Sequence, residues 1–129
     1  MKIIVIEPTK PPEVREIPDD QEAAYKAMSE IIGGYLECLP FTPTTDAFID
    51  EEAKIRDDKP PVMNGIATRL IRIFLDRLGR TLMPGDYITN TMVIVGNRNP
   101  KGEVDGDTYG VPQDVIDEVM NLSRTMVSE

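Results

Sequence analysis

The sequence predicts one α+β domain: a small mixed or antiparallel sheet of about five strands with about three helices, packed mainly on one face. Three observations predict this class. Short β-branched runs alternate with amphipathic helical runs, the strands come in neighbouring pairs, and strand-helix units do not repeat. A chain of 129 residues that is 40% hydrophobic can bury one core without disulfides or metals, so residues 1–129 are expected to form a single domain.

The first two strands and the first helix follow directly from local patterns. Residues 2–6 are almost entirely β-branched, and a proline-rich loop separates them from the alternating residues 14–17, so two neighbouring strands are expected. Residues 18–20 offer helix-capping side chains. Apolar residues then recur at helical spacing until Gly33 and Gly34, which predicts a first helix ending there.

A second pair of strands comes next. Residues 35–41 predict a third strand, closed by Pro40 and Pro43, because proline is tolerated at strand edges and ends. Residues 46–50 predict a weaker fourth strand. Residues 51–61 are charged and contain two prolines, which is typical of a loop.

The rest of the chain predicts helix, strand, loop and helix. Residues 64–78 carry their apolar side chains on one arc of a helical projection. After a turn at 83–86, residues 87–95 are strongly β-prone. Residues 97–110 are polar and glycine-rich and predict a loop, and an amphipathic helix is expected from Pro112 onward.

Composition narrows the range of partners. The 23 acidic and 14 basic residues give a net charge of −9, which repels polyanions, so direct DNA or RNA binding is not expected. No apolar stretch approaches the length of a membrane span, and the run at residues 2–6 stops too early for a signal peptide. The single cysteine, Cys38, lies in an apolar run and is expected to be a buried, inert thiol in a reducing compartment.

The chain lacks the residues from which most catalytic sites are built. It has no histidine, so the commonest general base and zinc ligand are missing, and no phosphate-binding glycine loop occurs. Two acidic groups invite metal chemistry: residues 50–52 with Asp57 and Asp58, and the group of Glu103, Asp105 and Asp107. Neither has a complete metal-loop spacing, so both are interpreted as solvated loops. We therefore expect no catalytic residues, no metal site and no cofactor, and a protein that is not an enzyme.

One constellation stands out on the predicted middle helix. At about 100° per residue, Arg69, Arg72 and Arg80 fall in one sector opposite the apolar arc, joined by Asp76, with Arg77 at the margin. This face is either the solvated side of an amphipathic helix or a site for phosphate or carboxylate, which guanidinium groups bind through paired hydrogen bonds.

The start of the same helix adds two candidate binding residues. Asn64 is a plausible N-cap and Thr68 lies one turn on, where free backbone N–H groups favour an anion. Capping alone explains Asn64 equally well. The candidate ligand site is therefore Asn64, Thr68, Arg69, Arg72 and Arg80.

Several short motifs occur in order along most of the chain: residues 1–8, 32–37, 50–54 and 60–64, Ala67 with Thr68, and Gly85 with Asp86 before residues 93–96. With these motifs the chain resembles an uncharacterised family of short phage, prophage and plasmid proteins, domain of unknown function 3846. The chain departs from the family where Ala53 replaces a usual glycine and where residues 71–83 are longer than usual. The resemblance implies a setting among the accessory genes of mobile elements, and it supplies no activity.

Three hypotheses follow. The first is a non-enzymatic accessory protein of a phage or mobile element that binds and sequesters a small anionic, nucleotide-type ligand between protomers of a homo-oligomer, as an anti-defence sponge does. The second is an acidic inhibitor that occupies a basic groove on a host protein. The third is a hydrolase using carboxylates and a divalent metal. A cytoplasmic location is expected, in the host cell if the protein is phage-encoded, with no membrane partner.

Overall fold

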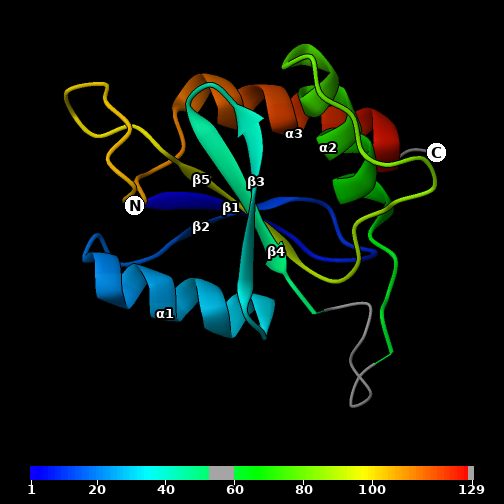
Figure 1. Ribbon diagram of the computed structural model, residues 1–129, viewed down its shortest axis with the longest axis horizontal. Helices are drawn as coiled ribbons and strands as arrows, with labels where there is room; N and C mark the ends of the chain where they lie inside the picture. Colours follow the sequence, from blue (N-terminus) through cyan, green and yellow to red (C-terminus); the bar gives the residue numbers. More distant parts are fainter. Residues whose placement is uncertain (53–59, 128–129) are drawn as a thin grey trace.

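The computed structural model describes residues 1–52 and 60–127. Its elements follow the predicted order of strands and helices (Figure 1). In chain order they are β1 (Lys2–Ile6), β2 (Glu13–Glu16), α1 (Gln21–Ile32), β3 (Leu36–Thr42), β4 (Thr45–Asp50), α2 (Gly65–Arg77), β5 (Met92–Gly96) and α3 (Gln113–Val127).

The five strands form one antiparallel sheet in the order β2-β1-β5-β4-β3. β5, which is distant in sequence from both neighbours, is inserted between β1 and β4. Val93 of β5 lies opposite Val5 of β1 on one side and Phe48 of β4 on the other. The predicted α+β class, with five strands and three helices, is confirmed.

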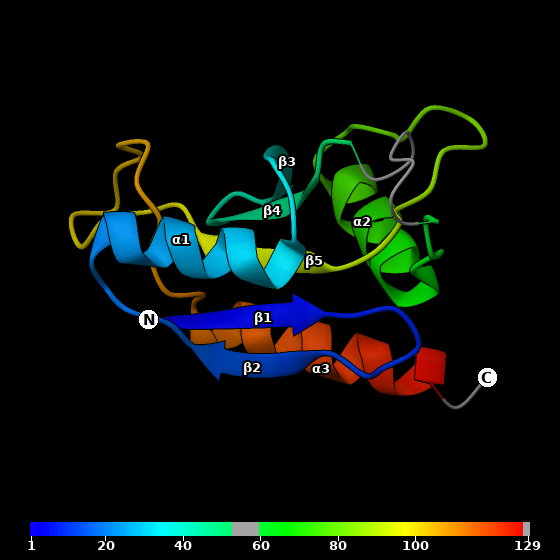
Figure 2. The ribbon, with the colours of Figure 1, turned by 90° about the horizontal axis from the view of Figure 1, so that it is seen from below.

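Both faces of the central strands are covered, because alternate residues of a strand point to opposite sides. α2 and α3 share one face, where their apolar residues pack on Ile4, Ile6, Met92 and Ile94. α1 covers the opposite face, packing on Ile3, Val5, Val93 and Val95. Figure 1 shows α1 below β1 and β2 and α3 above them, and in Figure 2, which is seen from below, α3 lies behind β2. Two of the three helices thus share a face as expected, and the third adds a second, smaller core.

Capping chemistry sets the ends of the helices. Asp20 caps the start of α1: its Oδ2 accepts a hydrogen bond from the Ala23 N–H at 2.9 Å. Gly33 ends the helix in the left-handed conformation with φ of 81°.

None of the helices in the described residues is long and apolar enough to span a membrane.

The last strand is shorter than the 87–95 predicted. Asn90 adopts a left-handed φ of 61°, which breaks the extended backbone, and β5 begins only at Met92. The preceding residues pair instead with the chain that enters α2: Asn64 N–H donates to Ile88 O, and Asn90 N–H donates to Val62 O. The β-prone residues 87–91 therefore form a short antiparallel bridge, Met63 with Thr89, and do not extend the sheet.

Cys38 is exposed on the edge strand β3, so the predicted burial of its thiol is wrong. Cys38 shares its side of β3 with Leu36, which packs against the core under α1, but its own surface stays exposed at the edge of the sheet. Removal from bulk water and the neighbouring Asp46 carboxylate raise the pKa of the thiol from 9.0 to about 11. The thiol is accessible but almost fully protonated near neutral pH.

Candidate functional site

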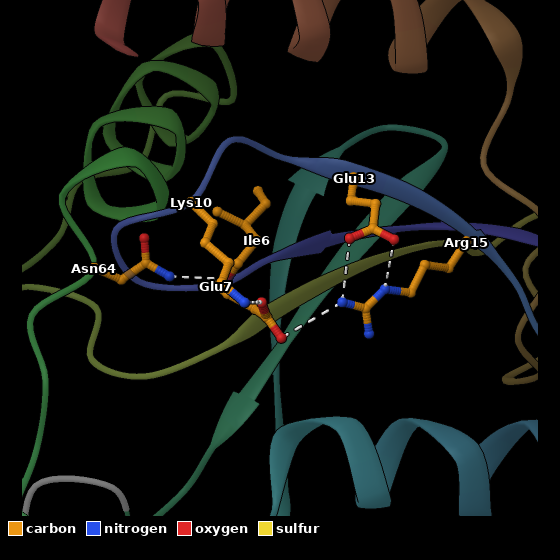
Figure 3. Close-up of polar contacts among 6 residues, drawn as sticks. All are labelled: Ile6, Glu7, Lys10, Glu13, Arg15 and Asn64. Carbon is orange, nitrogen blue, oxygen red and sulfur yellow. Dashed lines mark hydrogen bonds and ion pairs between the residues drawn. The ribbon is translucent and has the colours of Figure 1, made fainter.

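Asn64 is buried and is fully occupied by the fold, with only 1% of its surface exposed. Its Oδ1 accepts from the Ala67 N–H at 3.0 Å, which caps α2. Its Nδ2 donates to Ile6 O and to Asn90 O, each at 2.8 Å, and Figure 3 shows the first of these contacts. The side chain was predicted to face a ligand. Instead it connects the start of α2 to the end of β1 at Ile6 and to the backbone at Asn90.

Thr68 has a similar internal role. Its hydroxyl donates to Asn64 O at 2.8 Å and accepts from the Ile88 N–H at 2.9 Å. Only 6% of its surface is exposed, and these hydrogen bonds connect α2 to the segment before β5. Neither Asn64 nor Thr68 presents a polar group toward solvent.

The three predicted arginines are divided by the end of α2. Arg69 and Arg72 are exposed on the helix. Arg80 is exposed too, but it lies beyond the helix, so the helical projection that grouped it with the others does not hold. Gly79, with φ of 72°, closes the helix: its N–H donates to Asp76 O, and the Arg80 N–H donates to Leu75 O. These two bonds form a Schellman motif, which reverses the chain.

Between the reversed chain and α2 lies a surface cleft of about 280 Å³, which we call the Arg72 cleft. Arg72 and Asp76 line it from the helix, and residues 81–85 line it from the loop. Arg72 Nη2 donates to Asp86 O at 2.9 Å, which holds the guanidinium toward the loop. Within the described part of the chain, neither Arg72 nor Arg80 forms an ion pair with a carboxylate.

Other arginines are neutralised by neighbours. Arg77 forms a short hydrogen-bonded ion pair with Glu118 of α3 and lies over the Phe74 ring, 4.8 Å from its centroid. Both residues line a larger groove of about 470 Å³, whose walls are the β3–β4 hairpin and the facing ends of α2 and α3. The groove has mixed charge, since Asp114 and Glu118 oppose Arg77, and it offers no clear preference for an anion.

A charged cluster lies at the turn between β1 and β2 (Figure 3). Lys10 Nζ lies 3.2 Å from Glu7 Oε2, and Arg15 bridges Glu7 and Glu13. The hydrogen bond from Lys10, with support from Arg15, lowers the pKa of the Glu7 carboxyl. Thr9 in this turn has a left-handed φ of 66°, which is unusual for a β-branched residue. The cluster satisfies its own charges and leaves none for a ligand.

The predicted loop at 97–110 is confirmed, and hydrogen bonds hold it in place. Asp105 Oδ2 accepts from the Tyr109 hydroxyl at 2.5 Å and from Asn99 Nδ2 at 3.3 Å. The tyrosine hydrogen bond lowers the pKa of Asp105, and the same bond raises the pKa of Tyr109 to about 12. Among the described residues, no group of three or more acidic or cysteine side chains is arranged to hold a metal. Asp57 and Asp58 lie outside the described residues.

Sequence reasoning placed a turn at 83–86 but missed that the turn folds against α2. Pro84 and Gly85, the latter with φ of 81°, were the signal for the turn itself. Its packing partner could not be found from the sequence, because the docking depends on the chain reversal at Gly79 and on the Arg72 contact to Asp86.

The fold and this cleft define a class: a small α+β protein with an antiparallel sheet covered on both faces and a surface cleft lined by one arginine, Arg72, and one aspartate, Asp76. The model of one protein family matches residues 1–123, and the family is described as Domain of unknown function (DUF3846). The chain belongs to that family, as its motifs indicated. A search of the curated proteins gave no significant match. Neither did a search of the solved structures.

Proposed function

We propose that this protein is a non-enzymatic binding protein that captures a small anionic ligand of the nucleotide type at the Arg72 cleft. In the setting of a mobile element, such capture would keep a nucleotide signal from a host defence effector. The activity is sequestration, so it requires affinity and no chemistry.

One observation carries the proposal: Arg72, which lines the cleft, is an exposed guanidinium group without a carboxylate partner in the described residues, on a chain with a net charge of −9. Arg80 is exposed nearby in the chain but is not among the residues that line the cleft. Arg15 and Arg77, by contrast, pair with glutamates, whereas Arg98 and Arg124, which like Arg72 have no carboxylate partner among the described residues, do not line the cleft. A guanidinium held by one carbonyl keeps further N–H groups for a phosphate oxygen. Arg69, three residues before Arg72, adds positive charge to the same helix.

The size of the cleft supports a shared site between copies. Ligand pockets usually measure about 300–1,000 Å³, so the cleft of about 280 Å³ is too small and open to enclose a whole nucleotide. Met83 on the cleft loop is 76% exposed and offers an apolar surface to a second copy. We therefore expect a homo-oligomer in which a neighbouring protomer completes the enclosure.

The test is calorimetric titration of the purified protein with pyrophosphate, ATP, GTP and a cyclic dinucleotide at fixed salt, alongside native mass spectrometry. We expect binding of at least one nucleotide and an oligomeric mass. Arg72→Gln should weaken the affinity by about tenfold or more, the usual effect of losing a charged hydrogen bond.

Arg124→Gln is the matched control, because Arg124 is also exposed on a helix and its guanidinium donates a hydrogen bond to Asn121 Oδ1. Its affinity should equal that of the unchanged protein. A monomer that binds none of the four compounds would refute the proposal.

A second candidate function, docking of this acidic protein on a basic partner, is supported by the loop at 97–110. Val104 is 61% exposed and is flanked by the exposed carboxylates of Glu103 and Asp105. Because Asp105 holds the loop, the useful charge reversals are Glu103→Lys and Asp107→Lys. They should weaken binding to a host protein captured from lysate and leave nucleotide titrations unchanged; the opposite pattern would count against this candidate.

A further inference from the structure

We infer that the Arg72 cleft recognises the sugar-phosphate part of its ligand and leaves the base outside. Arg72 would bind the phosphate, and Asp76 would accept hydrogen bonds from sugar hydroxyls. This inference rests on the proposed function and specifies which part of a nucleotide the cleft reads.

The first step concerns Arg72 and Asp76 themselves. They are four residues apart on α2, a spacing that places side chains side by side, and both line the same cleft. Neither forms an ion pair with the other or with any described residue; Arg72 instead donates to Asp86 O. The order, with the cation nearer the helix N-terminus, is also the less favourable one for such a pair. Two opposite charges therefore share one cleft without neutralising each other.

The second step is the chemistry that suits this arrangement. A simple anion gains from Arg72 but is repelled by Asp76. A ligand that carries hydroxyl groups next to its phosphate gains from both, because a carboxylate accepts two or more hydrogen bonds while the guanidinium donates. The Thr81 side chain on the loop adds a hydroxyl to the cleft wall. A sugar phosphate has this pattern of groups.

The third step is what the cleft lacks. Its apolar lining comes from Leu82, Met83 and Pro84, and no aromatic residue is among the described residues that line it. Bases are usually held by stacking on aromatic rings, and the described walls of this open cleft of about 280 Å³ offer none. We therefore expect the cleft walls to make no specific contact with the base.

The test is titration of the full chain with inorganic phosphate, ribose 5-phosphate, adenosine, AMP and UMP, followed by calorimetry and by amide NMR shifts at residues 72–86. Ribose 5-phosphate should bind about tenfold more tightly than inorganic phosphate, since a hydrogen bond to a charged group is worth about that factor. AMP and UMP should bind equally, within about twofold, and adenosine should not bind.

Asp76→Asn separates the sugar contact from the phosphate contact. Inorganic phosphate should bind the variant as well or better, because the repulsion is gone, and the preference for ribose 5-phosphate should disappear. Asp117→Asn is the control, because Asp117 is exposed on α3 and contacts Gln113. Circular dichroism establishes that each variant is folded.

The outcomes separate the two proposals. A tenfold preference between AMP and UMP, or binding of adenosine as well as AMP, would overturn the inference, and either result would leave nucleotide capture standing. An Asp76→Asn variant that keeps the full preference for ribose 5-phosphate would overturn it as well. If no phosphate compound binds at all, the proposed function fails first and the inference falls with it.

Discussion

Asn64 shows how much of the local order can depend on one side chain. It joins three segments that are distant in sequence: the end of β1 at Ile6, the start of α2, and the bend at Asn90. Each of its contacts satisfies a backbone group that is shielded from water, and an unsatisfied buried group costs about 1–3 kcal/mol. The residue that looked like a ligand contact is therefore essential to the fold.

Replacing Asn64 should destabilise the protein strongly. Asn64→Ala removes the α2 cap and leaves the Ile6 and Asn90 carbonyls without their donor, so we expect a loss of about 2–4 kcal/mol in the free energy of unfolding. Urea denaturation measures it. Asn121→Ala, on the exposed face of α3, should change the free energy by less than about 0.5 kcal/mol. Equal stability of the two variants would contradict the structural role.

Cys38 should be accessible yet slow to react. With a pKa of about 11 instead of 9.0, the thiol holds roughly a hundredfold less thiolate at neutral pH, and the thiolate is the reactive form. We expect the rate of iodoacetamide alkylation to keep rising with pH well past 9. Asp46→Asn should speed alkylation near neutral pH, since it removes a negative charge that raises the pKa. A rate that levels off near pH 9 would contradict this prediction.

At the scale of elements, the end of β5 and the segment before α3 lie in close backbone contact, which two glycines, Gly96 and Gly110, permit. Gly96 N–H donates to Tyr109 O, and Tyr109 N–H donates back to Gly96 O. The backbones approach so closely that a Cβ on Gly96 would lie 2.2 Å from Gly110 O. This contact anchors the far end of the 97–110 loop beside the sheet and sets where α3 starts.

Gly96→Ala should therefore be among the most damaging single substitutions. The added methyl group collides with backbone atoms that have no side-chain freedom, so we expect a loss of more than about 2 kcal/mol of stability, measured by thermal unfolding. Gly65→Ala is the matched control. At Gly65, the first residue of α2, an added Cβ meets nothing within 4 Å, so its unfolding temperature should stay the same or rise. A tolerated Gly96→Ala would show that the two backbones can separate at little cost.

At the scale of the whole molecule, the protein combines a core on each side of a central sheet with a strongly acidic surface. The inner strands β1 and β5 are buried on both faces, while the edges, β2 and β3, carry exposed side chains. A net charge of −9 on a chain of 129 residues repels itself in the compact state.

Added salt should therefore stabilise the protein. Raising the sodium chloride concentration from about 10 mM to about 200 mM shortens the screening length from about 30 Å to below 10 Å, and so reduces repulsion among surface carboxylates. We expect a higher urea midpoint at the higher salt concentration, with an unchanged slope. The same screening should weaken binding of phosphate ligands at Arg72. A lower urea midpoint in salt would mean that attractive ion pairs, such as those of Glu7 and Arg77, outweigh the net charge.

Local patterns in the sequence determined the class of the fold, the order of its elements and the ends of its first two helices. These features depend on residues close together in the chain: the apolar spacing in α2, the Asp20 cap and the Gly33 and Gly79 stops. Composition alone also gave the net charge of −9.

Tertiary structure alone decided which polar residues are available to a ligand. Asn64 and Thr68 look free in a helical projection but are consumed by partners 20 to 58 positions away, and Asp76 gains its place beside Arg72 in a cleft only because the chain turns back at Gly79. A one-dimensional pattern records which face of an element a residue occupies. It does not record what packs against that face, because the packing depends on contacts between segments that are distant in the chain.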